Sequence, residues 1–274
     1  MFTNEVILSW LQYFARNVDI NLAKLKMLDI TGKNKNLIPT VMSNRAVLVF
    51  TDAGHPDIFY DMWNAELGNC DIWYNEGSDP TGEIKHDKVC HMINRGINAS
   101  AAMLIINPDA VTNYKIGMEN SRFSCGSVQY VCREVRAVIM NKLNLEDRDN
   151  ICIISGESIA VEAAMIAAEG SVVAVEYDCR DRDTMKENII KFGLNNVTIV
   201  ESLEEEVLHT LPIPNIAFIV GSPRIGTEIK SLLAVNPDID FVIYTLDFEV
   251  LTSLPALFRE YGLKRTEAIH IEVS

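Results

Sequence analysis

The turn at residues 155–158 is the first place in the sequence where residue types and spacing could support chemistry. Residues 151–164 read ICIISGESIAVEAA, so the turn Ser155-Gly156-Glu157-Ser158 follows a strand pattern and opens a helix pattern. Backbone amides at the N-terminus of a helix can receive an anionic or polar group. Loops that hold nucleotides usually contain several glycines, whereas this turn contains one. Both a ligand loop and an ordinary strand–helix corner fit this pattern.

Acids follow the next two strand patterns. Residues 171–178 read SVVAVEYD and place Glu176 at a strand end, where an acid can hydrogen-bond both hydroxyls of a ribose. The next strand ends in IVES at 199–202 and would border an adenine. Because the carboxyl ends of parallel strands share one edge of a sheet, these residues together predict a nucleoside site. The alternative for Glu176 alone is a solvated acid at a strand end.

The elements that must position these residues alternate along the second half. Apolar runs predict strands at 150–155, 171–178, 196–200, 215–222, 240–246 and 267–274. Amphipathic stretches predict helices at 133–143, 158–170, 182–194, 225–235 and 248–262. Strands that alternate with helices predict an α/β domain with a parallel sheet.

The first half predicts a smaller α/β unit. Strands are expected at 46–52, 70–77 and 101–107, and helices at 4–16, 55–66 and 83–95, with a short helix after Asp19. This order also predicts a parallel sheet. The apolar stripe of the first helix, with Trp10 and Phe14, is expected to cap the sheet or to form a subunit interface. Weak periodicity over 108–131 indicates a linker, so the predicted domains are 1–120 and 128–274.

Composition and charge exclude several classes of protein. The 274 residues are 48% hydrophobic and 23% charged, which is typical of a soluble globular protein. The net charge of −14 argues against a nucleic-acid partner and against an anionic membrane surface, because both need clustered lysine and arginine. The N-terminal residues lack a signal-peptide pattern, and no apolar run reaches bilayer length. The six scattered cysteines contain no C-x-x-C pair and are expected to be reduced and mostly buried, in the cytoplasm.

Several segments carry a resemblance to a known family. The segments are CREVRAVIMNKLNL (132–145), VEAA (161–164), VVAVEYD (172–178), ENIIKFGLNNVTIVES (187–202), AFIVGS (217–222) and the terminal HIEVS. Together they resemble the precorrin-6Y methyltransferase (decarboxylating) family of cobalamin biosynthesis. In the first half, AVLVFTDAGHPDIF (46–59) and IWYNEGSDPTGEI (72–84) resemble the C-terminal part of a tetrapyrrole methylase domain.

The resemblance implies a fold, a cofactor and a reaction. The fold is a truncated tetrapyrrole-methylase-like α/β subdomain followed by a Rossmann-like class I methyltransferase domain. The cofactor is S-adenosylmethionine (SAM), and the substrate is a tetrapyrrole methylated at two meso carbons. The rear domain serves one of these carbons and removes carbon dioxide from an acetate side chain. Relatives are commonly oligomers, so a homo-oligomer is expected.

The resemblance and the strand-end pattern together define the candidate site, with no catalytic residue assigned. The cofactor-binding candidates are Ser155, Gly156, Glu157, Glu176, Tyr177, Glu201, Ser202 and Gly221. The turn departs from the family pattern D-x-G-x-G-x-G, because Cys152 stands at the acid position and Ile154 and Glu157 stand at glycine positions. A non-catalytic homologue that kept the fold and lost the cofactor is therefore the alternative. In that case Ile154 and Glu157 would fill the pocket.

Two features of the first half suggest weaker candidates. His86, Cys90 and His91 would share one face of the predicted helix at 83–95, but two or three such residues do not make a structural zinc site. We therefore expect no metal. The aromatic residues Trp63, Trp73 and Tyr74 could stack on a flat macrocycle, and core packing is the competing interpretation.

Overall fold

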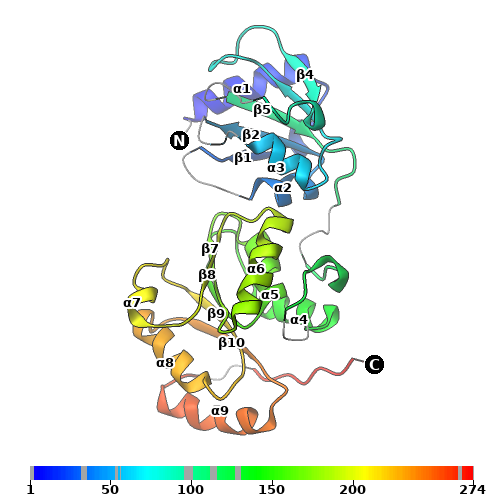
Figure 1. Ribbon diagram of the computed structural model, residues 1–274. Helices are drawn as coiled ribbons and strands as arrows, with labels where there is room; N and C mark the ends of the chain where they lie inside the picture. Colours follow the sequence, from blue (N-terminus) through cyan, green and yellow to red (C-terminus); the bar gives the residue numbers. More distant parts are fainter. Residues whose placement is uncertain are drawn as a thin grey trace. The chain divides into compact units, whose positions relative to one another are not determined.

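The computed structural model describes residues 3–31, 36–52, 55, 57–95, 101–111, 116–126, 131–264 and 267–273. The chain divides into two compact units (Figure 1). One contains Met1–Tyr114 and Lys191–Asn195, and the other contains Lys115–Ile190 and Asn196–Ser274. The predicted domain start at residue 128 lies outside the described residues. No helix in the described part of the chain combines the length and the apolar character needed to cross a bilayer.

The second unit is built on a five-stranded parallel sheet. Its strands are β6 (Asn150–Ile154), β7 (Ser171–Val175), β8 (Val197–Val200), β9 (Ile216–Val220) and β10 (Asp240–Tyr244). The order across the sheet is β10-β9-β6-β7-β8, and every neighbouring pair is parallel. The first strand therefore lies in the centre, and the chain winds outward from it in both directions. This confirms the predicted α/β class, although the described residues 267–273 form no strand.

In the described part of this unit six helices accompany the sheet, and the order of helices and strands confirms the predicted alternation. They are α4 (Arg133–Leu143), α5 (Glu157–Ile166), α6 (Cys179–Phe192), α7 (Glu205–Leu208), α8 (Ile225–Val235) and α9 (Phe248–Glu260). Side chains alternate between the two faces of each strand. One face packs Cys152, Ile154, Val175 and Ala217 against α7, α8 and α9. Helices α4, α5 and α6 lie on the opposite face (Figure 1).

The first unit has a mixed sheet, so the prediction of a parallel sheet is wrong there. Its strands are β1 (Lys26–Asp29), β2 (Ala46–Thr51), β3 (Asp71–Tyr74), β4 (Lys85–Lys88) and β5 (Ala101–Ile106), in the order β1-β2-β5-β3-β4. Only β1 and β2 pair in parallel, and the other three pairs are antiparallel. The predicted helix at 83–95 is instead β4 and a 3-10 turn, Val89–His91. The chain therefore reverses after β3 by a hairpin, without the helical crossover that a parallel strand needs.

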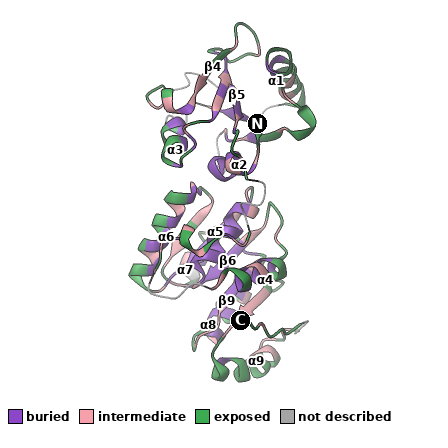
Figure 2. Cartoon of the chain, turned by 90° about the vertical axis from the view of Figure 1, so that its right-hand side faces the viewer, coloured by how far each residue is buried: buried purple, intermediate pink, exposed green. Residues whose placement is uncertain are grey.

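Helices cover both faces of this mixed sheet. Helix α1 (Asn4–Asn17) packs Trp10 and Phe14 onto one face, so of the two predicted alternatives the structure shows the cap on the sheet. Helices α2 (Leu37–Ser43) and α3 (Ile58–Asn64) pack on the other face. The short helix predicted after Asp19 is a 3-10 turn, Leu22–Lys24, that leads into β1. Figure 2 shows how the buried residues of each unit gather around its own sheet.

Candidate functional site

The turn after β6 adopts an unusual backbone at its serine and not at its glycine. Ser155 has a left-handed conformation with φ of 55°, and its N–H donates to the Val175 carbonyl at 3.0 Å. Gly156 has φ of −135°. A Cβ atom at Gly156 would lie 2.8 Å from Ile153 Cγ2 and 3.1 Å from the Phe218 ring. The glycine is therefore required for close packing against the sheet, and the serine supplies the turn.

Glu176 lies directly after β7, beside this turn. Its N–H donates to the Val200 carbonyl at 3.0 Å, which continues the parallel ladder by one residue. Its carboxyl group accepts a hydrogen bond from the Gly156 N–H. The side chain is 2% exposed, and its Oε1 atom has no hydrogen-bond partner. A buried carboxyl oxygen without a donor is costly, so this atom is suited to accept from a ligand.

Arg182 holds the backbone around Glu176 from the side of α6. Its Nη1 atom donates to the carbonyl oxygens of Glu176 and Tyr177 at 2.9 and 2.8 Å. Its Nη2 atom lies 3.5 Å from Glu201 Oε2. The guanidinium group therefore fixes the end of β7 and links it to the residue after β8. The side chain of Glu176 is held at the edge of the sheet as a consequence.

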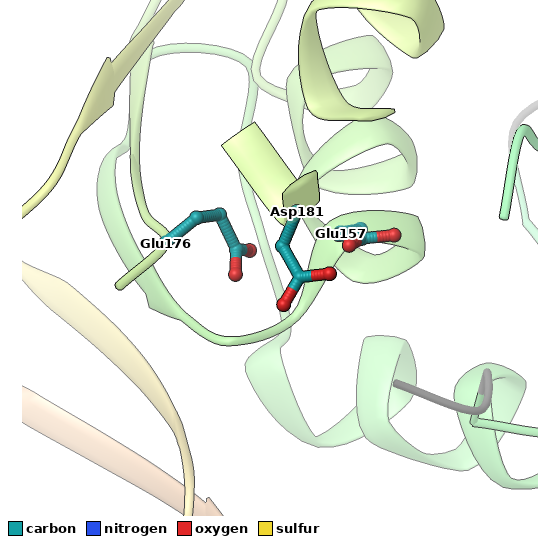
Figure 3. A group of neighbouring side chains, drawn as sticks. All are labelled: Glu157, Glu176 and Asp181. Atoms are coloured by element: carbon teal, nitrogen blue, oxygen red, sulfur yellow. The ribbon is translucent and has the colours of Figure 1, made fainter. Parts of the chain in front are cut away.

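Three buried acids converge at this edge, and we call them the acid triad: Glu157, Glu176 and Asp181 (Figure 3). Glu157 begins α5, Glu176 follows β7, and Asp181 lies in the first turn of α6. One carboxylate oxygen from each lies within 4.8 Å of the other two. The sequence interpretation included Glu157 and Glu176 but missed Asp181. The available signal was its position in the first turn of the helix that follows Glu176.

Burial and the neighbouring acids raise the pKa values of Glu157 and Glu176. Burial raises the pKa of Glu176 to about 8, and the neighbouring Glu157 and Asp181 add to the effect. Burial raises the pKa of Glu157 to about 7, with a further contribution from Asp181. Carboxyl groups that are crowded and withdrawn from water disfavour the ionised form. The triad is therefore an electrostatically strained cluster, the kind that functional sites often contain.

A segment that precedes α4 passes close to the triad. Gly126 lies so near that a Cβ atom there would overlap carboxylate oxygens of Glu157 and Asp181. Two buried side chains hold this segment. Asn188 accepts from the Ser124 N–H at 2.7 Å and donates to the Ser124 carbonyl at 3.2 Å. A glycine at position 126 is thus needed to leave space beside the acids.

The second anchor of this segment is Glu162 on α5. Its two carboxylate oxygens accept from the N–H groups of Gly117 and Met118 at 3.1 and 3.0 Å. The Arg136 Nε atom on α4 donates to Glu162 at 2.7 Å. Neither side chain was assigned a role from the sequence. The signal was an arginine and a glutamate within helices that are otherwise apolar on their inner faces.

The remaining predicted residues lie apart from the triad. The Tyr177 hydroxyl donates to Glu228 Oε1 on α8 at 2.8 Å, and the Arg224 guanidinium lies over its ring. Glu201 is exposed, and Ser202 is partly buried beyond β8. The Gly221 N–H donates to the Tyr244 carbonyl at 2.7 Å. The structure therefore brings together Gly156, Glu157 and Glu176, but not the full predicted set.

The substituted positions of the turn behave differently from one another. Cys152 and Ile154 are buried in the core on the α8 side of the sheet. Burial raises the pKa of the Cys152 thiol to about 12, so this thiol stays protonated. Ile154 therefore does not fill the site, as it would in the collapsed turn. Glu157 does lie within it.

The candidates in the first unit do not form a site. His86 Nε2 lies 3.0 Å from Asp71 Oδ1, and His91 Nδ1 lies 2.8 Å from Asp87 Oδ1. Each histidine therefore has its own acidic partner. The shared helix face that would have aligned them is absent, because residues 85–88 are a strand. Trp73 stacks on the His86 ring at 4.0 Å between centroids.

The fold and the site together define the class of protein domain to which the second unit belongs. A parallel sheet whose first strand is central, with an acid after the second strand beside the first turn, is the arrangement of a Rossmann-like domain that binds a nucleoside at its carboxyl edge. Comparison of the sequence with known protein families then identifies the family. Residues 126–273, more than half of the chain, match the precorrin methyltransferase domain. The chain belongs to this family.

Similar proteins carry names from the same group. A probable cobalt-precorrin-6B C(15)-methyltransferase (decarboxylating) of Sulfurisphaera tokodaii is 38% identical over 96 residues, which cover 34% of this chain and 50% of that protein. The Sulfolobus acidocaldarius protein of the same name is 40% identical over 70 residues, covering 25% of this chain and 36% of the relative. The chain thus spans half or less of the length of these curated relatives.

A solved structure supports the fold. The precorrin-6Y C5,15-methyltransferase of Geobacter metallireducens superposes with a TM-score of 0.50 at 27% identity. The match covers 54% of this chain and 80% of that one.

Proposed function

We propose that this protein is a SAM-dependent C-methyltransferase that acts on a tetrapyrrole precursor in cobalamin biosynthesis. Membership of the precorrin methyltransferase family supports this reaction. The names of two curated relatives, and of a solved structure of similar fold, point to the same type of substrate. The relatives described as decarboxylating suggest that loss of carbon dioxide accompanies methyl transfer.

The observation that carries the proposal is the unpartnered Oε1 atom of Glu176. This acid lies at the position where a nucleoside-binding domain of this topology contacts a ribose. Its free oxygen is an acceptor that needs a donor, and a ribose hydroxyl is one. The residues present on the ribose side of the site therefore fit the cofactor. Ser155 supplies the left-handed turn where the family pattern has glycines.

The roles of this chain's residues follow from their contacts. Glu176 would hold the ribose, and the Gly156 N–H and the Arg182 guanidinium keep it in place. When bound, SAM supplies an electrophilic methyl group on a sulfonium sulfur. Catalysis then depends largely on alignment of that methyl group with a macrocycle carbon. Rigid strand ends suit this task, because small displacements weaken alignment.

Three further expectations belong to the same proposal. The tetrapyrrole-methylase likeness of the first unit and self-association of the chain derive from the resemblance. The domain limits 1–120 and 128–274 derive from the weak periodicity between the two halves. The first unit has its own sheet and its own core, which supports a separate domain. We retain the cytoplasm as the expected location.

Calorimetric titration with S-adenosylhomocysteine tests the proposal most directly. The titration uses the whole chain in buffer with EDTA. We expect micromolar binding by the wild-type protein. Glu176→Gln should weaken binding by roughly 1–3 kcal/mol, because the buried partners lose their matched acceptor. Glu187→Gln removes the same charge from an exposed position on α6 and should leave the affinity unchanged.

Two results would count against the proposal. The absence of binding to folded wild-type protein at millimolar ligand would favour the non-catalytic homologue. Equal affinities of the Glu176→Gln protein and the wild type would remove the ribose contact from the proposal.

A further inference from the structure

The acid triad has the spacing of a cation site. Its three members come from three different elements, and each is buried, with exposures of 9% for Glu157, 2% for Glu176 and 5% for Asp181. Their oxygens lie within 4.8 Å of one another. Two oxygens on opposite sides of a Ca²⁺ ion are about 4.6–5.2 Å apart, since each bond is about 2.3–2.6 Å. The three oxygens can therefore surround one ion of this size.

A second observation separates this cluster from an ordinary group of acids. The Oε1 atom of Glu176 is buried and has no hydrogen-bond partner, and the carboxyl group that carries it is directed toward Asp181 (Figure 3). Among the described residues only two other buried side-chain oxygens share this condition, in Asn75 and Glu228. An acceptor left without a donor in such a place indicates a ligand that carries positive charge or a hydrogen-bond donor.

Among the described residues, no lysine or arginine side chain contributes to the pKa shifts of Glu157 and Glu176. The guanidinium group of Arg182, the residue after Asp181, is directed to backbone oxygens and to Glu201. The Gly156 N–H is a backbone donor to the Glu176 carboxyl group. Gly126 keeps the space next to Glu157 and Asp181 open. The site therefore combines three sets of hard oxygen ligands with one buried oxygen, Glu176 Oε1, that has no hydrogen-bond donor.

We propose that the acid triad binds one hard divalent cation, of the Ca²⁺, Mn²⁺ or Mg²⁺ class. Carboxylate oxygens are the ligands that these ions prefer. The ion would neutralise most of the charge of three ionised carboxylates. This site was not expected from the sequence, because Asp181 joins the other two acids only in the folded chain. The ion and a ribose both require Glu176, so they bind as alternatives.

Titration of the protein with Mn²⁺ tests the inference. The concentration of free Mn²⁺ at each step is measured by electron paramagnetic resonance. The sample is the whole chain after removal of metals by a chelating resin, without nucleoside. We expect saturable binding of one Mn²⁺ per chain. Glu157→Gln and Asp181→Asn should each weaken it at least about tenfold, because each removes one charged ligand. Gly126→Ala should weaken it similarly while all three acids remain.

The matched control is Glu187→Gln, which removes one negative charge, as Glu157→Gln does, but from an exposed position on α6. Thermal unfolding of each variant confirms that it is folded before the titration. Absence of saturable binding in the wild type would overturn the inference. So would equal losses in Glu157→Gln and Glu187→Gln, since the ions would then be held by the overall charge of −14. The titration with EDTA present, described above, reports on the nucleoside alone, so either proposal can fail without the other.

Discussion

The Arg136 Nε atom donates to Glu162 Oε1 at 2.7 Å, and both side chains are completely buried. Arg136 also donates to Asn120 Oδ1 at 3.0 Å and to the carbonyl oxygens of Val131 and Met118. Glu162 accepts from two backbone N–H groups of the same preceding segment. One ion pair thus fastens the segment that leads to Gly126 and the acid triad.

Loss of Arg136 should be severely destabilising. Arg136→Met leaves Glu162 as a buried charge without its partner, and such losses cost about 3–5 kcal/mol. We expect a decrease of that size in the free energy of unfolding, measured with urea. Arg133→Met provides the control, because Arg133 on the same helix pairs with Glu119 at the surface. Exposed pairs contribute about 1 kcal/mol or less. Similar losses in the two variants would contradict the assigned role.

The stability of the ligand-free protein should fall as the pH rises from about 5 to about 8. Glu157 and Glu176 have folded-state pKa values of about 7 and about 8, above the ordinary 4.5. The folded state therefore binds more protons than the unfolded state in this window, so stability decreases with pH and levels off above it. One pKa unit corresponds to about 1.4 kcal/mol, so the two shifts together predict a decrease of several kcal/mol in the free energy of unfolding, measured with urea. Glu176→Gln should flatten the profile, and an unchanged slope would contradict the raised pKa.

Replacement of Ser155 by glycine should stabilise the turn. A left-handed conformation costs a residue with a Cβ atom about 1–2 kcal/mol, and glycine avoids this at an entropic cost of about 0.5–1 kcal/mol. Ser155→Gly should therefore raise the free energy of unfolding by roughly 0.5–1 kcal/mol. Ser158→Gly, within α5, should lower it by about 1 kcal/mol. Chemical denaturation of both variants distinguishes these effects, and destabilisation by Ser155→Gly would argue against the strained turn.

The six cysteines should differ in reactivity. Cys125 and Cys179 are exposed, Cys90 and Cys132 are partly buried, and Cys70 and Cys152 are buried, so the prediction of mostly buried thiols is wrong. Burial raises the pKa values of Cys70 and Cys152 to about 12. Only the thiolate reacts with a disulfide reagent. In the native protein we expect rapid labelling of the two exposed thiols and none of the two buried ones until denaturant is added. Mass spectrometry of the labelled peptides identifies the sites, and early labelling of Cys152 would contradict its burial.

The elements of the second unit could be predicted because their apolar runs are long and their order is regular. Each predicted strand from 150 to 246 is present, and the helix at 133–143 matches α4 in both bounds. The elements of the first unit were harder to predict from the sequence. KHDK at 85–88 has no apolar alternation, and only pairing with β3 makes it a strand. Local pattern could not reveal that pairing, because the partner lies more than ten residues earlier in the chain.

The candidate site likewise has features that the sequence predicts and features that only the folded structure reveals. The sequence alone determined the parallel α/β order, the turn at 155–158 and the acid after β7, since these depend on local periodicity and on chain order. Only the tertiary structure decided that Asp181 joins Glu157 and Glu176, that Tyr177 turns away toward Glu228, and that Ser155 takes the left-handed turn. These outcomes depend on the direction of each side chain from its element and on which segments pack beside it. Such relations are set by the packing of the whole domain, and no short stretch of sequence contains them.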